Sequence, residues 1–331
     1  MTLGIGVIGC GVMAKSLATA VRDSAPEAKL VAAYDPFEPT REAFCAEYSV
    51  VSLASLEALL AREDIGAVLV ASPNFLHAEQ TVAAAQAGKH VFCEKPMALS
   101  VADCDRMIAA CAEHDVRLMV GHALRLQPLM RRLRELVASG ELGRPLHAVT
   151  QYWFNGFNQR DSGIWHVSRA KCGGLFYQMG IHHIDIMHSV FGPTQRVQYA
   201  GGRYGAQIED FDDVATVLLD SQSGGTGLIS VSSISTVSIN AMDFLFSDGY
   251  VKCDGPWSRM EYGRDPEHST TVEPDQIEGL AAVPMEVARF VDWVRHGATP
   301  VLPAAEGRAA VAVAEAADQA RDTGAPVEVA G

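Results

Sequence analysis

The stretch Leu3-Gly-Ile-Gly-Val-Ile-Gly-Cys-Gly-Val-Met-Ala14 decides the fold. Residues 3–8 are an apolar run typical of a buried strand, and the run ends in the turn Gly9-x-Gly11-x-x-Ala14. A helix is predicted after the turn, because apolar residues recur at helical spacing from Ala14 onward. Gly9 permits a tight turn, Gly11 lets backbone N–H groups approach a phosphate at the positive helix end, and Ala14 keeps helix and strand close. The stretch therefore predicts a phosphate-binding strand, turn and helix.

The next apolar run ends in an acidic residue where a dinucleotide-binding unit requires one. Residues 29–34 predict a second strand, and Asp35 follows it, 24 residues beyond Gly11. A carboxylate at this position binds the adenosine 2′-hydroxyl and repels a 2′-phosphate, so NAD is favoured over NADP. The alternative is a solvated Asp35 that opens the turn at Asp35-Pro36.

Composition sets the broad class of the protein. The 331 residues suffice for two domains, and 48% hydrophobic with 20% charged residues is typical of a globular enzyme. A net charge of -14 argues against nucleic acid or an anionic membrane as a partner. No apolar run approaches the roughly 20 residues that span a bilayer. Seven cysteines without a Cys-x-x-Cys pair indicate free thiols, and hence a cytoplasmic location.

Two further apolar runs end in polar residues suited to ligand binding. The run 65–71 predicts a central strand that ends in Ser72-Pro-Asn74-x-x-His77, and the run 90–93 predicts a strand that ends in Glu94-Lys95-Pro96. Open α/β sheets bind ligands at the carboxyl ends of their strands. The first segment is also compatible with a simple helix-capping turn.

Lys95 is the candidate proton acceptor of this edge. Pro96 gives Lys95 an extended backbone and so directs its side chain. Partial burial beside a cationic nicotinamide disfavours the charged amine, which suits Lys95 to accept a proton or to donate one to the reacting oxygen. The competing interpretation is a solvated surface lysine.

The strand and helix alternation stops near residue 123. Beyond it, hairpin signals separate consecutive strands, which predicts an antiparallel sheet. We expect strands at 145–154, 195–204, 212–220, 225–237, 240–247 and 249–254, helices at 283–296 and 304–322, and a last short strand at 327–329. The predicted fold is α/β, with a doubly wound parallel Rossmann sheet in residues 1–123 and an α+β domain with an open, largely antiparallel sheet in residues 124–331. The C-terminal helices are free to pack back on the first domain.

A segment in the second half carries unusual chemistry. On a regular helix, Gln178, His182 and Asp185 share one face, where the acid could orient the imidazole toward a hydroxyl. Two alternatives are histidines that are merely part of the core and a metal site that uses His182, His183, Asp185 or His188. The metal site is disfavoured because adjacent histidines point apart on a helix.

In order along the chain, these motifs resemble the glucose-fructose oxidoreductase and inositol dehydrogenase family (Gfo/Idh/MocA). The resemblance covers nearly the whole length, and Glu-Lys-Pro is its most specific element. Its motifs are Gly9-x-Gly11-x-x-Ala14, Ser72-Pro-Asn-x-x-His77, Glu94-Lys95-Pro96, Gly173-Gly174, Gly180-x-His182-x-x-Asp185, Phe290-Val-x-x-Val294 and Gly324-x-Pro326-Val327.

The resemblance implies an NAD(P)-dependent oxidoreductase that acts on a sugar, cyclitol or related cyclic polyol, with Lys95 and His182 flanking the reacting carbon. Many members carry an Asp where this chain has Gln178, so acid–base work would fall on Lys95 and His182. Trp165-His166 replaces the frequent Trp-Arg. A glycosidase that uses NAD for transient oxidation, an aromatic dihydrodiol dehydrogenase and a silent dinucleotide sensor are the alternatives.

The predicted site residues fall into two further groups besides the catalytic pair. The predicted substrate-binding residues are Gln178, Arg125, Tyr152, Asn155 and Trp165. The predicted cofactor-binding residues are Gly9, Gly11, Val12, Met13, Asp35, Ser72, Asn74, His77, Glu94 and Lys95. The expected partners are a small polyol or sugar and a second copy of the chain in a dimer or tetramer, and no metal is expected.

Overall fold

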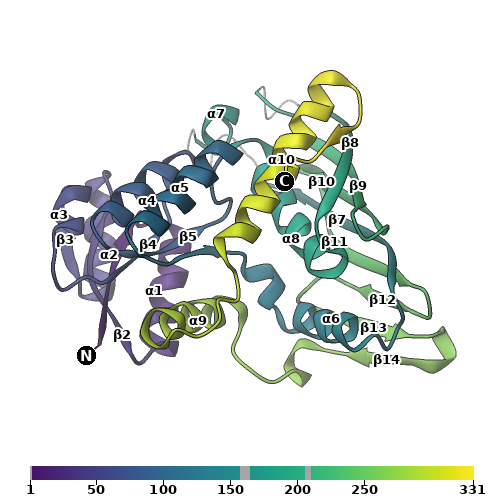
Figure 1. The fold of residues 1–331 in the computed structure, drawn as a ribbon, viewed down its shortest axis with the longest axis horizontal. Coiled ribbons are helices and arrows are strands. Elements are labelled where there is room, and N and C mark those ends of the chain that lie inside the picture. Colours follow the sequence, from purple (N-terminus) through teal and green to yellow (C-terminus); the bar gives the residue numbers. More distant parts are fainter. Residues whose placement is uncertain (1, 157–164, 206–209) are drawn as a thin grey trace. The chain divides into compact units, whose positions relative to one another are not determined.

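The computed structural model describes residues 2–156, 165–205 and 210–331 (Figure 1). The chain divides into two compact units. Unit 1 comprises Met1–Ala123 and Leu280–Arg308, and unit 2 comprises Leu124–Gly279 and Ala309–Gly331. Among the described residues, no helix is both long and apolar enough to cross a membrane.

Unit 1 is built on a parallel sheet of six strands in the order β3-β2-β1-β4-β5-β6. Every neighbouring pair in it is parallel, and the order reverses at β1, as in doubly wound dinucleotide-binding folds. The predicted Rossmann architecture of the N-terminal half is confirmed. The strands are β1 (Leu3–Ile8), β2 (Ala28–Tyr34), β3 (Val51–Leu53), β4 (Ala67–Val70), β5 (His90–Glu94) and β6 (Leu118–Gly121).

Helices cover both faces of this sheet, as alternate residues of β5 demonstrate. Phe92 contacts Phe290 of α9 with ring centroids 5.7 Å apart, whereas the neighbouring Cys93 interacts with Thr81 of α4 and with Cys104 of α5. Figure 1 shows α9 beside α1, although about 260 residues separate them in the chain. The helices of unit 1 are α1 (Val12–Ser24), α2 (Glu38–Tyr48), α3 (Leu56–Leu60), α4 (His77–Gln86), α5 (Val101–Glu113) and α9 (Ala282–His296).

Unit 2 is built on a mixed sheet of nine strands in the order β14-β13-β12-β11-β7-β10-β9-β8-β15. Only β7 and β10 pair in parallel, so the sheet is largely antiparallel, as predicted. The strands are β7 (Pro145–Asn155), β8 (Thr194–Gly202), β9 (Val214–Ser221), β10 (Thr226–Ser232), β11 (Ile234–Phe246), β12 (Tyr250–Cys253), β13 (Met260–Gly263), β14 (Ser269–Val272) and β15 (Val327–Glu328).

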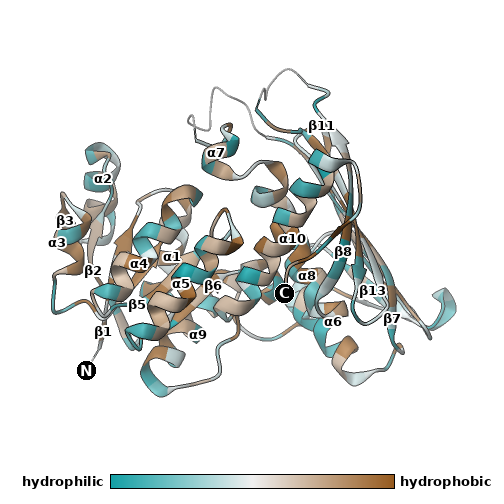
Figure 2. Cartoon of the chain, turned by 45° about the horizontal axis from the view of Figure 1, so that its top comes forward, coloured by the Kyte–Doolittle hydropathy of each residue, from teal (hydrophilic) through white to brown (hydrophobic). Residues whose placement is uncertain are grey.

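The helices of unit 2 gather on one side of its sheet. Figure 2 shows α6 and α8 on that side, and α8 contacts both β7 and β10. Among the described residues of unit 2, no helix covers the opposite face, which agrees with the predicted open sheet. The helices are α6 (Pro128–Ser139), α7 (Arg169–Cys172), α8 (Ile181–Phe191) and α10 (Ala304–Thr323), whose first residues belong to unit 1.

Two strand predictions in this sheet were wrong in their limits. We expected a strand at 225–237 and the next at 240–247, but β10 ends at Ser232 and β11 already begins at Ile234. The register of β11 against β7 shifts between Ile234 and Ile239, so a bulge and not a turn lies in this segment.

Candidate active site

The first turn of unit 1 has the backbone geometry of a phosphate site. Gly9 has φ +86, and a Cβ on it would lie 2.7 Å from the backbone nitrogen of Ser72. Gly11 precedes α1 and carries no side-chain cap, and a Cβ on it would meet no heavy atom within 4 Å. Val12 and Met13, the first residues of α1, are 83% and 38% exposed. The uncapped N–H groups of this helix therefore fit the pyrophosphate of a dinucleotide.

We expect alanine substitutions of Gly9 and Gly11 to have different effects. Gly9→Ala should destabilise unit 1, because both the positive φ and the contact with Ser72 oppose a side chain. Gly11→Ala should keep the melting temperature and weaken dinucleotide binding, because its Cβ meets no protein atom but would obstruct the approach of a phosphate. Thermal unfolding and NADH titration of both variants check this. Equal losses of stability would contradict the separation of roles.

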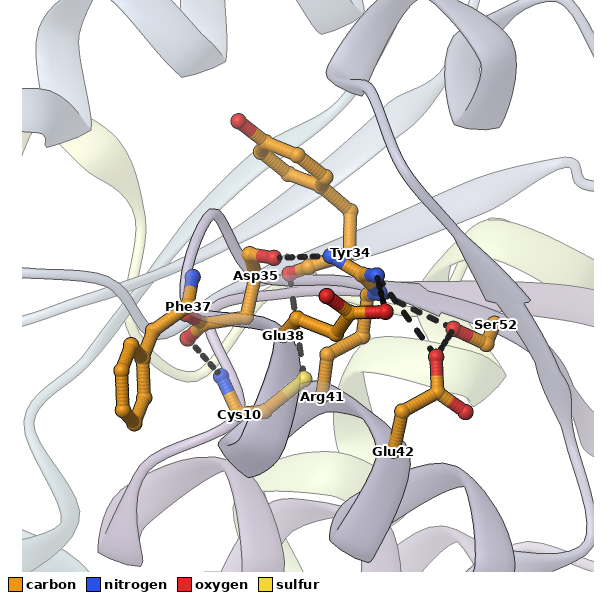
Figure 3. Close-up of polar contacts among 8 residues, drawn as sticks. All are labelled: Cys10, Tyr34, Asp35, Phe37, Glu38, Arg41, Glu42 and Ser52. Carbon is orange, nitrogen blue, oxygen red and sulfur yellow. Dashed lines mark hydrogen bonds and ion pairs between the residues drawn. The ribbon is translucent and has the colours of Figure 1, made fainter.

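Asp35 joins this turn to the end of β2 (Figure 3). Its Oδ2 accepts a hydrogen bond from the Cys10 backbone N–H at 2.9 Å, and its Oδ1 accepts one from the Phe37 N–H at 2.8 Å. The carboxylate is half-buried, and each oxygen keeps acceptor capacity for a ligand hydroxyl. The structure thus places the predicted ribose acid beside the predicted phosphate turn.

The buried His77 ring contacts the backbone of the loop after β4. The ring is completely buried, and its two nitrogens lie 2.9 Å from the carbonyl oxygens of Pro96 and Ser72. Burial lowers the pKa of His77, so the neutral ring donates to one of these carbonyls and links the loop after β4 to the loop after β5. Ser72 donates from its hydroxyl to Gln80 at 2.5 Å, and Asn74 is 7% exposed. Contact of these residues with a cofactor stays a prediction.

Lys95 follows β5 in an environment that favours its neutral form. It is half-buried, and its peptide bond to Pro96 is cis. Burial lowers the pKa of Lys95, while the neighbouring Glu94 carboxyl opposes that shift. A lowered pKa makes it easier for the amine to lose its proton and so to act as a proton acceptor. The predicted partial burial of Lys95 is therefore present in unit 1, and its position beside a nicotinamide stays a prediction.

A second buried acid, Glu286, accompanies Glu94, and the sequence reasoning missed it. Glu94 is 5% exposed and accepts the Lys95 backbone N–H at 3.2 Å, whereas Glu286 of α9 is 0% exposed. Burial raises the pKa of Glu94 to about 7, and burial together with the Glu94 carboxyl raises the pKa of Glu286 well above its usual range. The sequence could have indicated that Glu286 is buried, because it is spaced four residues from both Ala282 and Phe290 and so shares their buried face of α9.

In unit 2, the helix expected to carry Gln178 is not regular. Residues Phe176–Gly180 form a π-helical turn that leads into α8. A Cβ on Gly180 would lie 2.4 Å from the Phe176 ring, so the wider turn depends on glycine at this position. The expectation of one unbroken α-helix was therefore wrong, because periodicity of 3.6 residues does not reveal an inserted residue.

The side-chain amide of Gln178 contacts His166, a residue of the preceding loop. It is 4% exposed, and its Nε2 donates to the His166 carbonyl oxygen at 3.0 Å while its Oε1 lies 3.1 Å from His166 Nδ1. Both ends of the amide therefore bind His166. The ring of Trp165 also lies against His166, with centroids 3.5 Å apart. The two departures from the family pattern, Gln178 and His166, are thus partners in the structure.

Asp185 and Arg125 form a buried ion pair in unit 2. Arg125 is 4% and Asp185 1% exposed. The guanidinium binds both carboxylate oxygens, with Nε donating to Oδ2 at 2.8 Å and Nη2 donating to Oδ1. This bidentate geometry ties the segment Ala123–Leu126 to α8. The role predicted for Arg125 in substrate binding stays a prediction.

The two adjacent histidines of α8 have different surroundings. His182 is half-buried at the first turn of the helix. His183 is 2% exposed, and burial lowers its pKa to about 4, so it is a neutral core residue near the ring of Tyr152. His182 therefore keeps the candidate role. No group of three or more His, Cys, Asp and Glu residues within the described ranges could hold a metal ion.

The other predicted substrate residues lie on β7. Tyr152 is half-buried and stacks on Phe154 with centroids 5.1 Å apart, and burial raises the pKa of Tyr152. Asn155, the last residue of the strand, is exposed. Their contact with a substrate stays a prediction.

Comparison with known proteins adds two family matches. Residues 3–122 match the model described as "Oxidoreductase family, NAD-binding Rossmann fold", and residues 130–252 match the GFO/IDH/MocA C-terminal domain. The D-apiose dehydrogenase of Paraburkholderia graminis is 30% identical over 88% of this chain and 78% of its own length. The aldose-aldose oxidoreductase of Caulobacter crescentus has a crystal structure with a TM-score of 0.89 and 26% identity, covering 99% of this chain and 100% of that one.

A third relative is named for a different kind of reaction. The 2,7-anhydro-N-acetylneuraminate hydratase of Mediterraneibacter gnavus is 34% identical over 64% of this chain. The matched segment is 56% of that protein, so the chain spans little more than half the length of this relative.

Proposed function

The chain belongs to the GFO/IDH/MocA oxidoreductase family, and from this premise we propose that it transfers a hydride between a nicotinamide cofactor and a secondary alcohol of a sugar, cyclitol or related cyclic polyol. The observation that carries the proposal is the position of Lys95, which follows the carboxyl end of β5 in an NAD-binding fold. Burial there lowers the pKa of its amine. A nicotinamide supplies the hydride chemistry when bound, and the protein supplies alignment and proton transfer.

The residues divide this work in a definite way. We propose that Lys95 and His182 exchange the proton of the reacting hydroxyl, since burial lowers the pKa of the Lys95 amine and imidazole groups commonly act as general acids and bases. Gln178, Tyr152, Asn155 and Trp165 are proposed to hold the ring of the substrate. The Gln178 amide is neutral and bonded to His166, so it can position a hydroxyl but cannot relay a proton.

We also propose that NAD(H) is the preferred cofactor. Asp35→Asn keeps the size of the side chain and removes its charge, so the NADH dissociation constant should rise roughly ten- to hundredfold with the loss of a charge-assisted hydrogen bond. Fluorescence titration with NADH and NADPH measures this. Asp23→Asn near the C-terminal end of α1 is the control, because this exposed carboxylate pairs with the adjacent Arg22 and lies away from the glycine turn. An unchanged NADH to NADPH preference would remove the role of Asp35.

A second candidate function is a reaction with transient oxidation and no net redox change. The hydratase relative favours it, because addition of water to an anhydro sugar leaves the oxidation state of the product unchanged overall. Such an enzyme would use a tightly held NAD and would produce no NADH in solution.

One assay separates these functions. The purified chain is incubated with NAD or NADP and a panel of sugars, cyclitols, anhydro sugars and aromatic dihydrodiols, and absorbance at the NADH band is followed beside product analysis. Steady NADH formation supports the dehydrogenase. Product without NADH supports transient oxidation, and cofactor binding without any product supports a silent sensor.

We further propose a cytoplasmic homo-oligomer. All seven cysteines are free and buried, which suits a reducing compartment. The open face of the nine-stranded sheet is a surface on which a second copy could pack. Native mass spectrometry gives the state directly, and a monomer at micromolar concentration would contradict the proposal.

A further inference from the structure

The buried Arg41 side chain is held by polar partners next to Asp35, the proposed ribose ligand, and its carboxylate partners are exposed (Figure 3). Arg41 belongs to α2, and its side chain is only 9% exposed. Nε donates to Ser52 Oγ at 2.9 Å, Nη1 donates to the Asp35 backbone carbonyl at 2.9 Å, and Nη2 lies 3.5 Å from Glu42 Oε1. Nε and Nη1 therefore donate hydrogen bonds, and Nη2 takes part in an ion pair.

Ser52 and Glu42 reinforce each other in this cluster. The Ser52 hydroxyl accepts from Arg41 and donates to Glu42 Oε1 at 2.5 Å. Ser52 is fixed on β3, where it pairs with Ala33 of β2, so the anchor belongs to the sheet and not to a surface loop. The three side chains thus close a ring of polar contacts that orients the guanidinium toward β3.

The charge around Arg41 is more negative than positive. Glu42 and the more distant Glu38, whose Oε1 lies 4.0 Å from Nη2, share the guanidinium, whereas the Asp35 carboxylate faces the Cys10 and Phe37 N–H groups (Figure 3). An arginine near the end of the second strand is the group that accommodates the 2′-phosphate of NADP in folds of this kind, because its planar fork matches a phosphate. Here that group exists, but its nitrogens already contact the Ser52 hydroxyl, the Asp35 backbone carbonyl and the two glutamate carboxylates.

We propose that Glu42, with Ser52, is a specificity-determining residue that keeps Arg41 from serving as a 2′-phosphate ligand, so that the choice of NAD(H) depends on this cluster as well as on Asp35. The inference rests on the proposed use of a nicotinamide dinucleotide. Asp35 repels the phosphate, and Glu42 withholds the cation that would attract it. Substitution of Asp35 alone therefore removes the repulsion of the 2′-phosphate but does not make Arg41 available to bind it.

The two contributions can be separated by combining substitutions. Asp35→Ser alone should weaken NADH binding and improve NADPH binding only slightly. Asp35→Ser with Glu42→Ala should lower the NADPH dissociation constant by a further tenfold or more, because the guanidinium loses its carboxylate and becomes available to the phosphate. Fluorescence titration of each variant with NADH and NADPH provides the readout without reference to turnover.

A matched control removes a different acid from the same helix. Glu47 of α2 binds Lys15 at 2.6 Å and is 46% exposed, so Asp35→Ser with Glu47→Ala changes the net charge equally without freeing Arg41. This control should resemble Asp35→Ser alone. Adding Arg41→Met to the Glu42 double variant should abolish its gain, provided that far-UV circular dichroism shows the variant folded.

The outcomes are distinct. Equal NADPH affinity in the Glu42 and Glu47 double variants overturns the inference, and this comparison holds even if the Arg41 variant does not fold. A gain that survives Arg41→Met overturns it as well. Wild-type protein that binds neither NADH nor NADPH overturns the proposed function itself, whereas wild-type protein that binds NADH leaves that function standing whatever the variants do.

Discussion

Lys95→Met is expected to lower kcat by roughly 10²- to 10⁴-fold, the range of a general acid–base group, while cofactor affinity changes little. The substitution keeps most of the apolar stem and removes the amine. Because burial lowers the pKa of Lys95, the wild-type kcat/KM should rise with pH as the amine loses its proton. This limb of the pH profile should vanish in the variant. Steady-state kinetics over a pH series and NADH titration measure both effects.

Lys95→Arg distinguishes a proton acceptor from a simple positive charge. Arginine keeps the charge but cannot lose its proton near neutral pH, so it should be nearly as inactive as methionine if proton transfer is the role of Lys95. Lys252→Met on β12 is the matched control, because Lys252 is exposed in the other unit. Normal turnover by Lys95→Met, or full activity of Lys95→Arg, would show that the proton passes through another group.

The parallel sheet of unit 1 could be predicted because its strands are buried on both faces. The β4 strand, Ala67–Val70, is entirely buried, and such continuous apolar runs are visible in a sequence without any knowledge of neighbours. The glycine turn, Asp35 and the Glu94-Lys95-Pro96 element then follow at strand ends, where topology places ligand-binding residues. Local pattern and global fold agree in this half of the chain.

The edge of the second sheet could not be predicted in the same way. We did not expect β13 or β14, and three of the four residues of β14 are exposed. Ser269–Val272 is short and polar, so its strand conformation comes from pairing with β13 and not from its own hydrophobic pattern. The π-helical turn at Phe176–Gly180 escaped for a related reason, because it depends on how the Phe176 ring packs against Gly180.

The partners of buried polar side chains also could not be predicted from the spacing of residues in the sequence. On a regular helix Asp185 was expected to orient the imidazole of His182, yet both of its oxygens accept hydrogen bonds from Arg125, which lies 60 residues earlier. Similarly, Arg41 is an ordinary helical arginine in the sequence, and only the register of β3 brings Ser52 to it. Contacts between distant segments are set by tertiary structure, which a single sequence does not display.

The buried pair of Arg125 and Asp185 carries the second large expected effect. Asp185→Asn or Arg125→Met should each lower the free energy of unfolding of unit 2 by about 3–5 kcal/mol, because either change leaves the partner's charge buried without compensation. The double variant Arg125→Met with Asp185→Leu should recover much of that loss, since it removes both charges and fills the space with apolar atoms. Urea unfolding followed by tryptophan fluorescence is suitable, because Trp153, Trp165 and Trp257 all lie in unit 2.

An exposed ion pair of the same chemistry is the control. Arg196 on β8 and Asp220 on β9 are joined by short hydrogen bonds, but their side chains are 47% and 28% exposed. Arg196→Met should therefore cost no more than about 1 kcal/mol, since solvent screens the charges that remain. Similar small costs for Arg125→Met would contradict a structural role for the buried pair. The guanidinium of Arg125 would then be available for the substrate-binding role that the sequence predicts, and loss of substrate affinity in Arg125→Met would be the measurement to make next.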